Sequence, residues 1–190
     1  MRTLKRAPFR QESSARRIPR GQATITTERP RAYVDIETTG FSPYRDELTV
    51  VGICLERGRT HELVQLYDDN LTRKNILAAL DEITSLYTYN GARFDLPFIA
   101  AKLGVDLASE LDHCDLMHHC WRRNLWGGQK AVEFQLGISR ETKGMAGIDA
   151  VRLWHAYKRR GDAAALRMLL LYNAEDVTNL AHIRRRLKVR

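Results

Sequence analysis

Cysteines and long apolar runs are both scarce in this sequence of 190 residues. The three cysteines, Cys54, Cys114 and Cys120, are odd in number and include no C-x-x-C pair, which argues against a disulfide framework. The longest apolar stretches, residues 50–55 and 169–172, are far shorter than the ~20 residues of a membrane span. We therefore expect a soluble protein in the reducing cytoplasm, with no membrane partner.

Acidic residues are nearly absent from the two ends of the chain. Residues 1–30 carry eight Lys or Arg against two Glu, and residues 184–190 carry five basic residues and no acid. Subtracting +6 and +5 from the total of +8 leaves −3 for the 153 residues between them. Basic ends on a slightly acidic body indicate flexible arms that bind a polyanion, with solubilising tails as the alternative.

The composition supports one core and one arm. A chain that is 44% hydrophobic can bury a single good core at this length, and we expect one domain over residues 31–190. Residues 1–30 are predicted to be a flexible basic N-terminal arm. Their Arg-rich, acid-poor composition also resembles a targeting segment, but Pro8, Pro19 and Gly21 would interrupt its amphipathic helix.

The order of expected elements indicates an α/β fold. Short β-branched or aromatic runs predict strands, and apolar residues at helical spacing predict helices, the first of them capped by Thr72. The expected strands are 32–36, 48–55, 61–67, 86–89 and 111–115, and the expected helices are 72–83, 95–103, 116–123, 131–136, 150–159 and 162–187. This order predicts a mixed central β-sheet flanked by α-helices, the layout of a ribonuclease H-like fold.

Two acidic residues share one face of the first predicted strand. In the segment AYVDIETTG, Asp35 and Glu37 stand two residues apart, and alternate side chains of a strand point the same way. Adjacent carboxylates repel each other unless a cation neutralises them, and their oxygen atoms suit Mg²⁺ or Mn²⁺. A solvated strand end is the alternative for this motif taken alone.

Further acids follow in two later segments. Asp95 in YNGARFDLPFI comes after a short predicted strand and begins a helix, where a negative charge also suits a helix N-terminus. Tyr172 and Asp176 in YNAEDVTNL are four residues apart and therefore share one face of the last helix. Apolar neighbours predict that this face packs inward, so polar groups on it need a function.

These segments together resemble the three motifs of the DEDD (DnaQ-like) superfamily of 3′-5′ exonucleases. D-x-E-T-T-G, N-x-x-x-F-D and Y-x-x-x-D occur in that order. Tyr172 is similar to the tyrosine of one subtype, and Leu171 stands where the histidine subtype has its histidine. The segments HCDLMHHC, LGISR and WHAYKRRGDAAALRMLLLYNAEDV resemble YprB-type ribonuclease H-like proteins. The resemblance spans roughly residues 32–182.

The resemblance implies hydrolysis of phosphodiester bonds with two divalent cations, Mg²⁺ or Mn²⁺, per active site. It assigns the metal-binding and catalytic roles to four carboxylates, Asp35, Glu37, Asp95 and Asp176. Tyr172 completes the catalytic set, and we expect it to orient the attacking water. A phenol with an ordinary pKa of about 10 is protonated at neutral pH and is a poor base.

Residues beside these acids are the candidates for binding substrate, which we expect to be single-stranded DNA or RNA with a free 3′ end. Asn90 is expected to hydrogen-bond near the terminal nucleotide and Phe94 to pack against it, with core packing as the alternative for Phe94. The turn of Thr38, Thr39 and Gly40 offers backbone N–H groups to the 3′ hydroxyl or a base. A tight turn explains Gly40 equally well.

Other chemically capable residues have simpler interpretations. The His- and Cys-rich segment at residues 113–120 lacks zinc-finger spacing. Its Asp115 is expected to be a structural cap, with a fifth acid near the metals as the alternative. Trp121 and Trp126 could stack on bases, whereas Trp154 is expected in helix packing. Basic residues between the second and third motifs form either a phosphate-binding rim or a solvated face: Arg122, Arg123, Lys130, Arg140 and Lys143.

The sequence therefore predicts a ribonuclease H-like 3′-5′ exonuclease that uses a two-metal-ion mechanism. Two alternatives stay open. One is a structure-selective endonuclease of the same fold, and the other is a non-catalytic nucleic-acid-binding module whose basic ends do the binding. Whether the domain works alone or within a larger repair or RNA-processing assembly is also open.

Overall fold

A five-stranded mixed sheet forms the centre of the molecule. The computed structural model describes residues 29–189, and the sheet has the order β3-β2-β1-β4-β5. Strand β1 pairs antiparallel with β2 and parallel with β4, while β2–β3 is antiparallel and β4–β5 is parallel. The strands are β1 (Arg31–Thr38), β2 (Leu48–Arg57), β3 (Thr60–Tyr67), β4 (Ser85–Thr88) and β5 (Asp112–Asp115).

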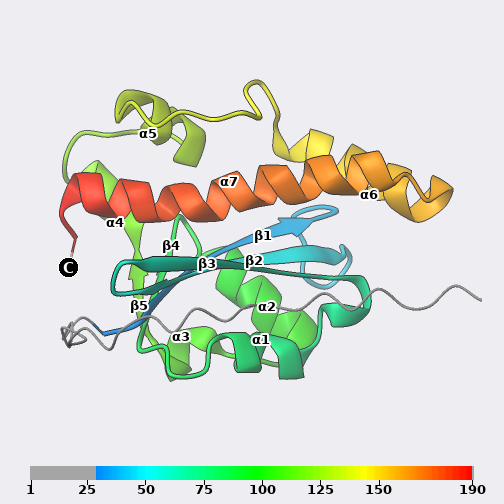
Figure 1. Cartoon of the computed structure of the whole chain (residues 1–190), viewed down its shortest axis with the longest axis horizontal. Coiled ribbons are helices and arrows are strands. Elements are labelled where there is room, and N and C mark those ends of the chain that lie inside the picture. The colour runs from blue at the N-terminus through cyan, green and yellow to red at the C-terminus, as the bar shows by residue number, and fades with distance from the viewer. Residues whose placement is uncertain (1–28, 190) are drawn as a thin grey trace, which may run out of the picture.

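Helices cover both faces of this sheet (Figure 1). On one face lie α1 (Arg73–Ala79), α2 (Asp95–Leu103) and α3 (Leu107–Glu110). The other face carries α4 (Leu116–Trp121), α5 (Gln129–Gln135), α6 (Gly147–Arg160) and the long α7 (Ala163–Leu187). A short 3-10 helix, η1 (Asp68–Asn70), follows β3. The predicted mixed sheet flanked by helices is confirmed, and the fold is ribonuclease H-like.

The alternation of side chains along β1 determines where its acids point. Val34 and Ile36 pack into the cluster that also holds residues of α1, α2 and α3. Tyr33, on the opposite side of the strand, packs with residues of α4 and α7. Because Asp35 and Glu37 follow Tyr33 at intervals of two, they lie on the face that α7 covers.

Local sequence signals explain several helix ends. The Thr72 side chain accepts from the backbone N–H of Asn75 at the start of α1, and Asp162 does the same for α7. Gly104 ends α2 in the left-handed conformation, with φ 65°. The helix expected over 72–83 is shorter than predicted, and α3 was not predicted, because four residues are too few to show a helical period.

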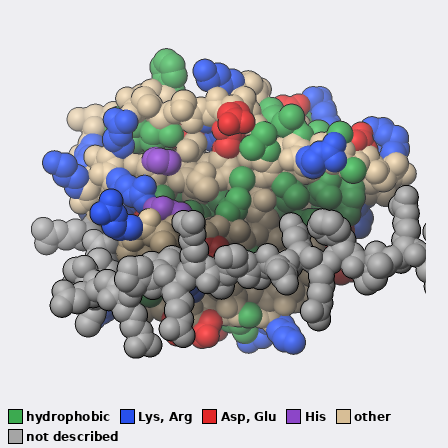
Figure 2. All heavy atoms as spheres, viewed as in Figure 1, with side chains coloured by type: hydrophobic (Ala, Val, Ile, Leu, Met, Phe, Trp, Pro, Cys, Tyr) green, Lys and Arg blue, Asp and Glu red, His purple; other side chains and the backbone are tan. Residues whose placement is uncertain are grey.

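Residues 184–187 belong to the helix expected over 162–187, which the structure confirms, and the alternative of a flexible basic arm is wrong for them. They form the last turn of α7, and Arg184 is only 8% exposed. Its guanidinium donates to Glu56 of β2 at 2.8 Å and to the Tyr33 hydroxyl at 2.6 Å. The buried carboxylate of Glu56 supplies the compensating charge that a buried arginine needs. Figure 2 shows other basic side chains around this end of α7.

The N-terminal arm predicted over residues 1–30 lies outside the described residues, apart from Arg29 and Pro30, and stays a prediction. Within residues 29–189, none of the helices is long and apolar enough to cross a membrane.

Candidate active site

Three carboxylates from two elements meet beside the central strand. One oxygen atom each of Asp35, Glu37 and Asp176 lies within 4.8 Å of the others. Asp35 and Glu37 come from β1, and Asp176 comes from α7, which packs across the same face of the sheet. The two-residue period of the strand and the inward face of the helix therefore assemble this cluster.

The donors of this cluster fit a divalent cation. Glu37 is 6% exposed and Asp176 is 7% exposed, and Oε1 of Glu37 is buried without a hydrogen-bond partner. An unpaired buried anionic oxygen costs free energy unless a cation compensates it. Carboxylate oxygens are the ligands that Mg²⁺ and Mn²⁺ prefer, so the three acids are suited to hold such an ion.

Electrostatic repulsion within the cluster also favours a cation. Desolvation raises the pKa of Asp35 well above its usual range, and repulsion from Asp176 raises it further. The pKa of Glu37 is raised by the same two causes in the same order. A divalent cation between these groups would stabilise their ionised forms and lower both pKa values.

Asp95 lies beside the three acids but outside their metal-binding distances. It is 5% exposed, begins α2, and its Oδ1 accepts from the backbone N–H of Ile36 at 3.2 Å. Desolvation raises the pKa of Asp95 to about 7, although the hydrogen bond from Ile36 acts in the opposite direction. Asp95 thus borders the cluster with one oxygen bound to the backbone of β1.

Asn173 orients Asp35 and was not among the predicted site residues. It is fully buried on α7, and its Nδ2 donates to Oδ2 of Asp35 at 3.3 Å. The Nε2 of Gln65 on β3 donates in turn to Oδ1 of Asn173 at 3.0 Å. Gly52, paired with Asp35 in the sheet, leaves the space that Asn173 occupies.

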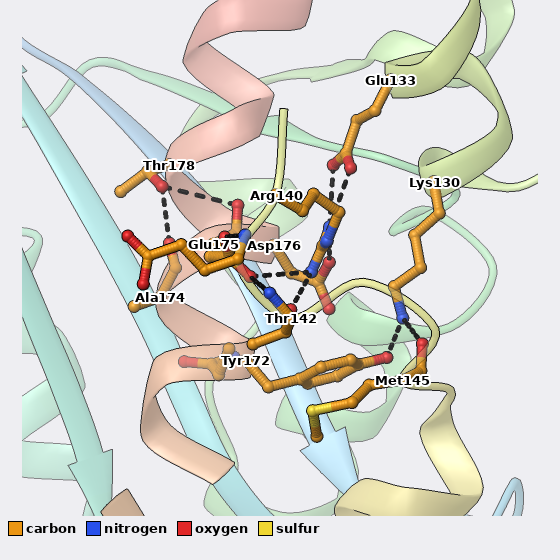
Figure 3. Close-up of polar contacts among 12 residues, drawn as sticks. Lys130, Glu133, Arg140, Thr142, Met145, Tyr172, Ala174, Glu175, Asp176 and Thr178 are labelled. Atoms are coloured by element: carbon orange, nitrogen blue, oxygen red, sulfur yellow. Dashed lines mark hydrogen bonds and ion pairs between the residues drawn. The ribbon is translucent and has the colours of Figure 1, made fainter. Parts of the chain in front are cut away.

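Lys130 of α5 binds the tyrosine of the site. Its Nζ donates to the Tyr172 hydroxyl and to the carbonyl of Met145, and lies 4.0 Å from the centre of the Tyr172 ring (Figure 3). Burial raises the pKa of Tyr172, and repulsion from Asp176, Glu37 and Asp35 raises it further. The phenol is therefore protonated at neutral pH and can donate a hydrogen bond but not act as a base.

Arg140 bridges Asp176 to a second buried acid. Its Nη1 lies 2.6 Å from Oδ1 of Asp176 and 2.8 Å from Oε2 of Glu133. Glu133 is 1% exposed and also accepts from Gln129 at 2.9 Å. Burial would lower the pKa of Arg140, but the attraction of Asp176 and Glu133 outweighs it and raises the pKa. Figure 3 shows Arg140 between Glu133 and Asp176.

The solvated-face interpretation is thus wrong for Lys130 and Arg140, whose charges point into the acid cluster. Arg122, Arg123 and Lys143 are exposed, which both the solvated face and the phosphate-binding rim allow. No local pattern predicts this difference, because the contacts of Lys130 with Tyr172 and of Arg140 with Asp176 span 42 and 36 residues.

A pocket of about 910 Å³ surrounds the carboxylates. The five predicted substrate-binding residues all line it: Thr38, Thr39, Gly40, Asn90 and Phe94. The exposed Phe41 side chain lies next to Phe94, with ring centres 6.2 Å apart. Because Phe94 also contacts Phe98 of the core, it combines the two alternatives of core packing and exposure to the pocket.

Part of this lining is explained by the protein's own contacts. The Thr38 hydroxyl donates to the carbonyl of Gly40 at 2.7 Å, and the Thr39 hydroxyl accepts from Glu47. A Cβ atom on Gly40 would meet the carboxylate of Asp46, which accepts from the backbone N–H of Ser42 at 2.8 Å, so a larger residue there would displace this contact of the turn. Asn90 adopts φ 62°, a left-handed conformation that asparagine tolerates well.

The His- and Cys-rich segment forms no metal-binding group within residues 29–189. His113 bonds to the Thr88 hydroxyl, and Cys114 contacts His119. Asp115 caps α4 by accepting from Met117, and it also accepts from the backbone N–H of Asn90. Its expected role as a structural cap is confirmed.

A family model described as the RNase H superfamily matches residues 32–188. No curated protein matches the chain.

Solved structures share the fold at low sequence identity. The family B DNA polymerase from the hyperthermophilic archaeon Pyrobaculum calidifontis aligns with 85% of this chain at 16% identity and a TM-score of 0.65. This chain spans only 25% of that polymerase. NrnC from Brucella melitensis, bound to pGG, is 24% identical, with a TM-score of 0.55 over 83% of this chain and 71% of its own. A nuclease in its apo form is 22% identical, with a TM-score of 0.52 and coverages of 84% and 72%.

Proposed function

The chain belongs to the RNase H superfamily, and from this premise we propose that it is a metal-dependent 3′-5′ exonuclease acting on single-stranded DNA or RNA. The observation that carries the proposal is the group of Asp35, Glu37 and Asp176, whose oxygens approach within 4.8 Å in a pocket. Its buried, unpaired Glu37 oxygen supports a cation at this place.

Asp35, Glu37 and Asp176 would hold a divalent cation, Mg²⁺ or Mn²⁺, and Asp95 would complete the ligands for a second one. When bound, such cations stabilise the charge on a phosphodiester and lower the pKa of water. The protonated Tyr172 hydroxyl would orient the attacking water. Asn173 would hold the Asp35 carboxylate in place, since it already donates to it.

The same site supports a finer family assignment, which we include in the proposal. The order of the acids and the tyrosine four residues before Asp176 fit the DEDD superfamily and its tyrosine subtype, within the YprB-type group. Brucella melitensis NrnC, which shares the fold, was solved with pGG, an oligonucleotide. A substrate of the same chemical class suits the pocket here, which Phe41 and Phe94 line beside the acids.

The proposal is tested by a time course with 5′-labelled single-stranded DNA and RNA in Mg²⁺, Mn²⁺ or EDTA. The wild type is compared with Asp176→Asn, which keeps the shape of the side chain. Glu62→Gln is the matched control, because Glu62 is an exposed acid on β3, away from the pocket. We expect a ladder that shortens from the 3′ end, requires the metal, and is lost only in Asp176→Asn.

A circular single strand separates the remaining possibilities. Its cleavage would indicate the endonuclease alternative. Binding that is insensitive to EDTA, with no cleavage of any strand, would reject an enzyme and leave the binding module.

A further inference from the structure

Two tryptophans form a stacked pair at the edge of the pocket. Trp121 ends α4 and lines the pocket that holds the carboxylates. Its ring lies 5.9 Å from that of Trp126, at an interplanar angle of 24°, and its other neighbour is His118, at 5.4 Å and 79°. Trp126 is 58% exposed. The pair therefore extends an aromatic surface from the pocket toward solvent.

The loop that carries Trp126 is held in place by several contacts. The backbone N–H of Leu125 donates to the carbonyl of Cys120 at 3.1 Å. The carbonyl of Trp126 accepts from Gln135 of α5 at 2.9 Å, and the carbonyl of Gly127 accepts from the Tyr89 hydroxyl at 2.7 Å. A tryptophan on a loop fixed in this way loses little conformational freedom when a ligand stacks on it.

The third tryptophan, Trp154, has a structural role and serves as a comparison for Trp126. Trp154 is 5% exposed, packs in the cluster between α6 and α7, and donates its indole N–H to Glu47 at 3.1 Å. Trp126 differs in that most of its side chain is in contact with solvent. Core packing therefore explains Trp154 and leaves the exposure of Trp126 without a structural reason.

The surroundings of the pair favour a nucleic-acid ligand. Lys130 and Arg140 turn toward the acid cluster, so the exposed charges of residues 121–143 are three basic residues, Arg122, Arg123 and Lys143, against one acid, Glu141. Exposed Arg122 and Arg123 directly follow Trp121. Positive charge beside aromatic faces is the combination that binds single strands, because phosphates pair with the cations and bases stack on the rings.

We propose that Trp121 and Trp126 form a base-stacking subsite for the single strand on the 5′ side of the nucleotide that is removed. The inference rests on the proposed exonuclease function and deepens it. The aromatic group at Phe41 and Phe94 lines the pocket near the residues expected to bind the terminal nucleotide. The tryptophan pair is a separate aromatic group, continuous with the same pocket, for a nucleotide farther from the 3′ end.

The test measures binding without turnover. It uses the full chain with Asp35→Asn, which prevents cleavage, and with Trp154→Phe, so that fluorescence reports only on Trp121 and Trp126. Single-stranded DNA and RNA hexamers of adenine are titrated in, together with hexamers that lack one base at the second, third or fourth position from the 3′ end. The subsite predicts saturable quenching and weaker binding when one particular base is missing.

Replacement of the rings should abolish this base dependence. Trp126→Ala is expected to weaken binding of the intact hexamer about tenfold, within the range measured for base stacking on aromatic side chains. The Trp126→Ala variant should bind the intact hexamer and the hexamer that lacks the stacked base with equal affinity. Trp126→Phe keeps an aromatic face and should restore most of the affinity, which a loss of folding would not allow.

Two outcomes would overturn the subsite. One is equal affinity of Trp126→Ala, Trp121→Ala and the parent for the intact hexamer. The other is equal affinity for every hexamer that lacks a base. Neither result depends on hydrolysis, so the subsite and the exonuclease activity fail separately: the activity fails if the wild type shortens no strand.

Discussion

A Cβ atom on Gly52 would lie 2.3 Å from Oδ1 of Asn173. Gly52 is directly opposite Asp35 in the β1–β2 pair, and Asn173 reaches over it from α7 to donate to the Asp35 carboxylate. The absence of a side chain on the central part of β2 therefore determines how closely α7 approaches the acids on β1.

Gly52→Ala is expected to move Asn173 away from Asp35. Such overpacking in a filled interior costs roughly 1–3 kcal/mol, which urea unfolding would measure. Because the carboxylate loses its donor, the affinity for Mn²⁺ should fall as well, as measured by titration calorimetry. Gly147→Ala is the control for stability, since a Cβ at Gly147 meets no atom within 4 Å. Equal stability of the two variants would contradict this prediction.

The effect of Glu37→Gln on the melting temperature should change sign when metal is bound. In EDTA, Glu37→Gln removes a buried acid with an unpaired oxygen and should raise the melting temperature. In saturating Mg²⁺ or Mn²⁺ the wild type should gain stability by mass action, whereas the variant should gain little. Scanning calorimetry with and without metal would measure both. A wild type whose melting temperature ignores both cations would contradict the cation site.

The pH dependence of the metal-free protein has a defined direction. The pKa values of Asp35 and Glu37 are raised in the folded state. The stability that comes from their protonation is therefore complete at a pH below their pKa values in the unfolded state, about 4. It is lost as the pH rises through their pKa values in the folded state. In EDTA the wild type should therefore lose stability relative to the double variant Asp35→Asn/Glu37→Gln as the pH rises from 5 to 8. A wild type that gains stability relative to this variant with rising pH would contradict it.

The contribution of Glu56 to stability should depend on pH in the opposite direction. Burial would raise the pKa of Glu56, but the attraction of Arg184 and the hydrogen bonds from Tyr33, Arg31 and Arg185 outweigh it and lower the pKa. The stability that Glu56 contributes is thus complete at a pH above its pKa in the unfolded state. It is lost as the pH falls through its pKa in the folded state. Glu56→Gln should cost about 3 kcal/mol at pH 7 and less at pH 3. Chemical unfolding at both pH values tests this.

Arg140→Met should be strongly destabilising, because it leaves Glu133 and Asp176 buried without their cation. We expect a loss of about 3–5 kcal/mol. Adding Glu133→Leu should recover part of the loss, since one unpaired charge is then removed. The matched control is Arg152→Met, whose partner Asp149 lies in an exposed pair and whose effect on stability should be far smaller. Additive losses in the double variant would contradict the coupling.

Local patterns predicted the sheet, most of the helices and the acids of the site. The alternation of β1 and the four-residue spacing of Tyr172 and Asp176 are local properties, and each correctly placed its residues on one face. The approach of Asn173 to Asp35 and of Arg140 to Asp176 depends on how distant elements pack, which no local period encodes. The buried ion pair of Arg184 was not predicted for the same reason: its partner Glu56 is 128 residues away.

The long helix α7 is attached to β1 at two points, through Asn173 to Asp35 and through Arg184 to Tyr33. A helix turns by about 100° with each residue. The number of residues between Asn173 and Arg184 therefore determines whether both side chains face the sheet. Removing one residue between them would turn one attachment away from the sheet while the other stayed in place. Changes of length should therefore be tolerated in the loops of this domain but not in this stretch of helix.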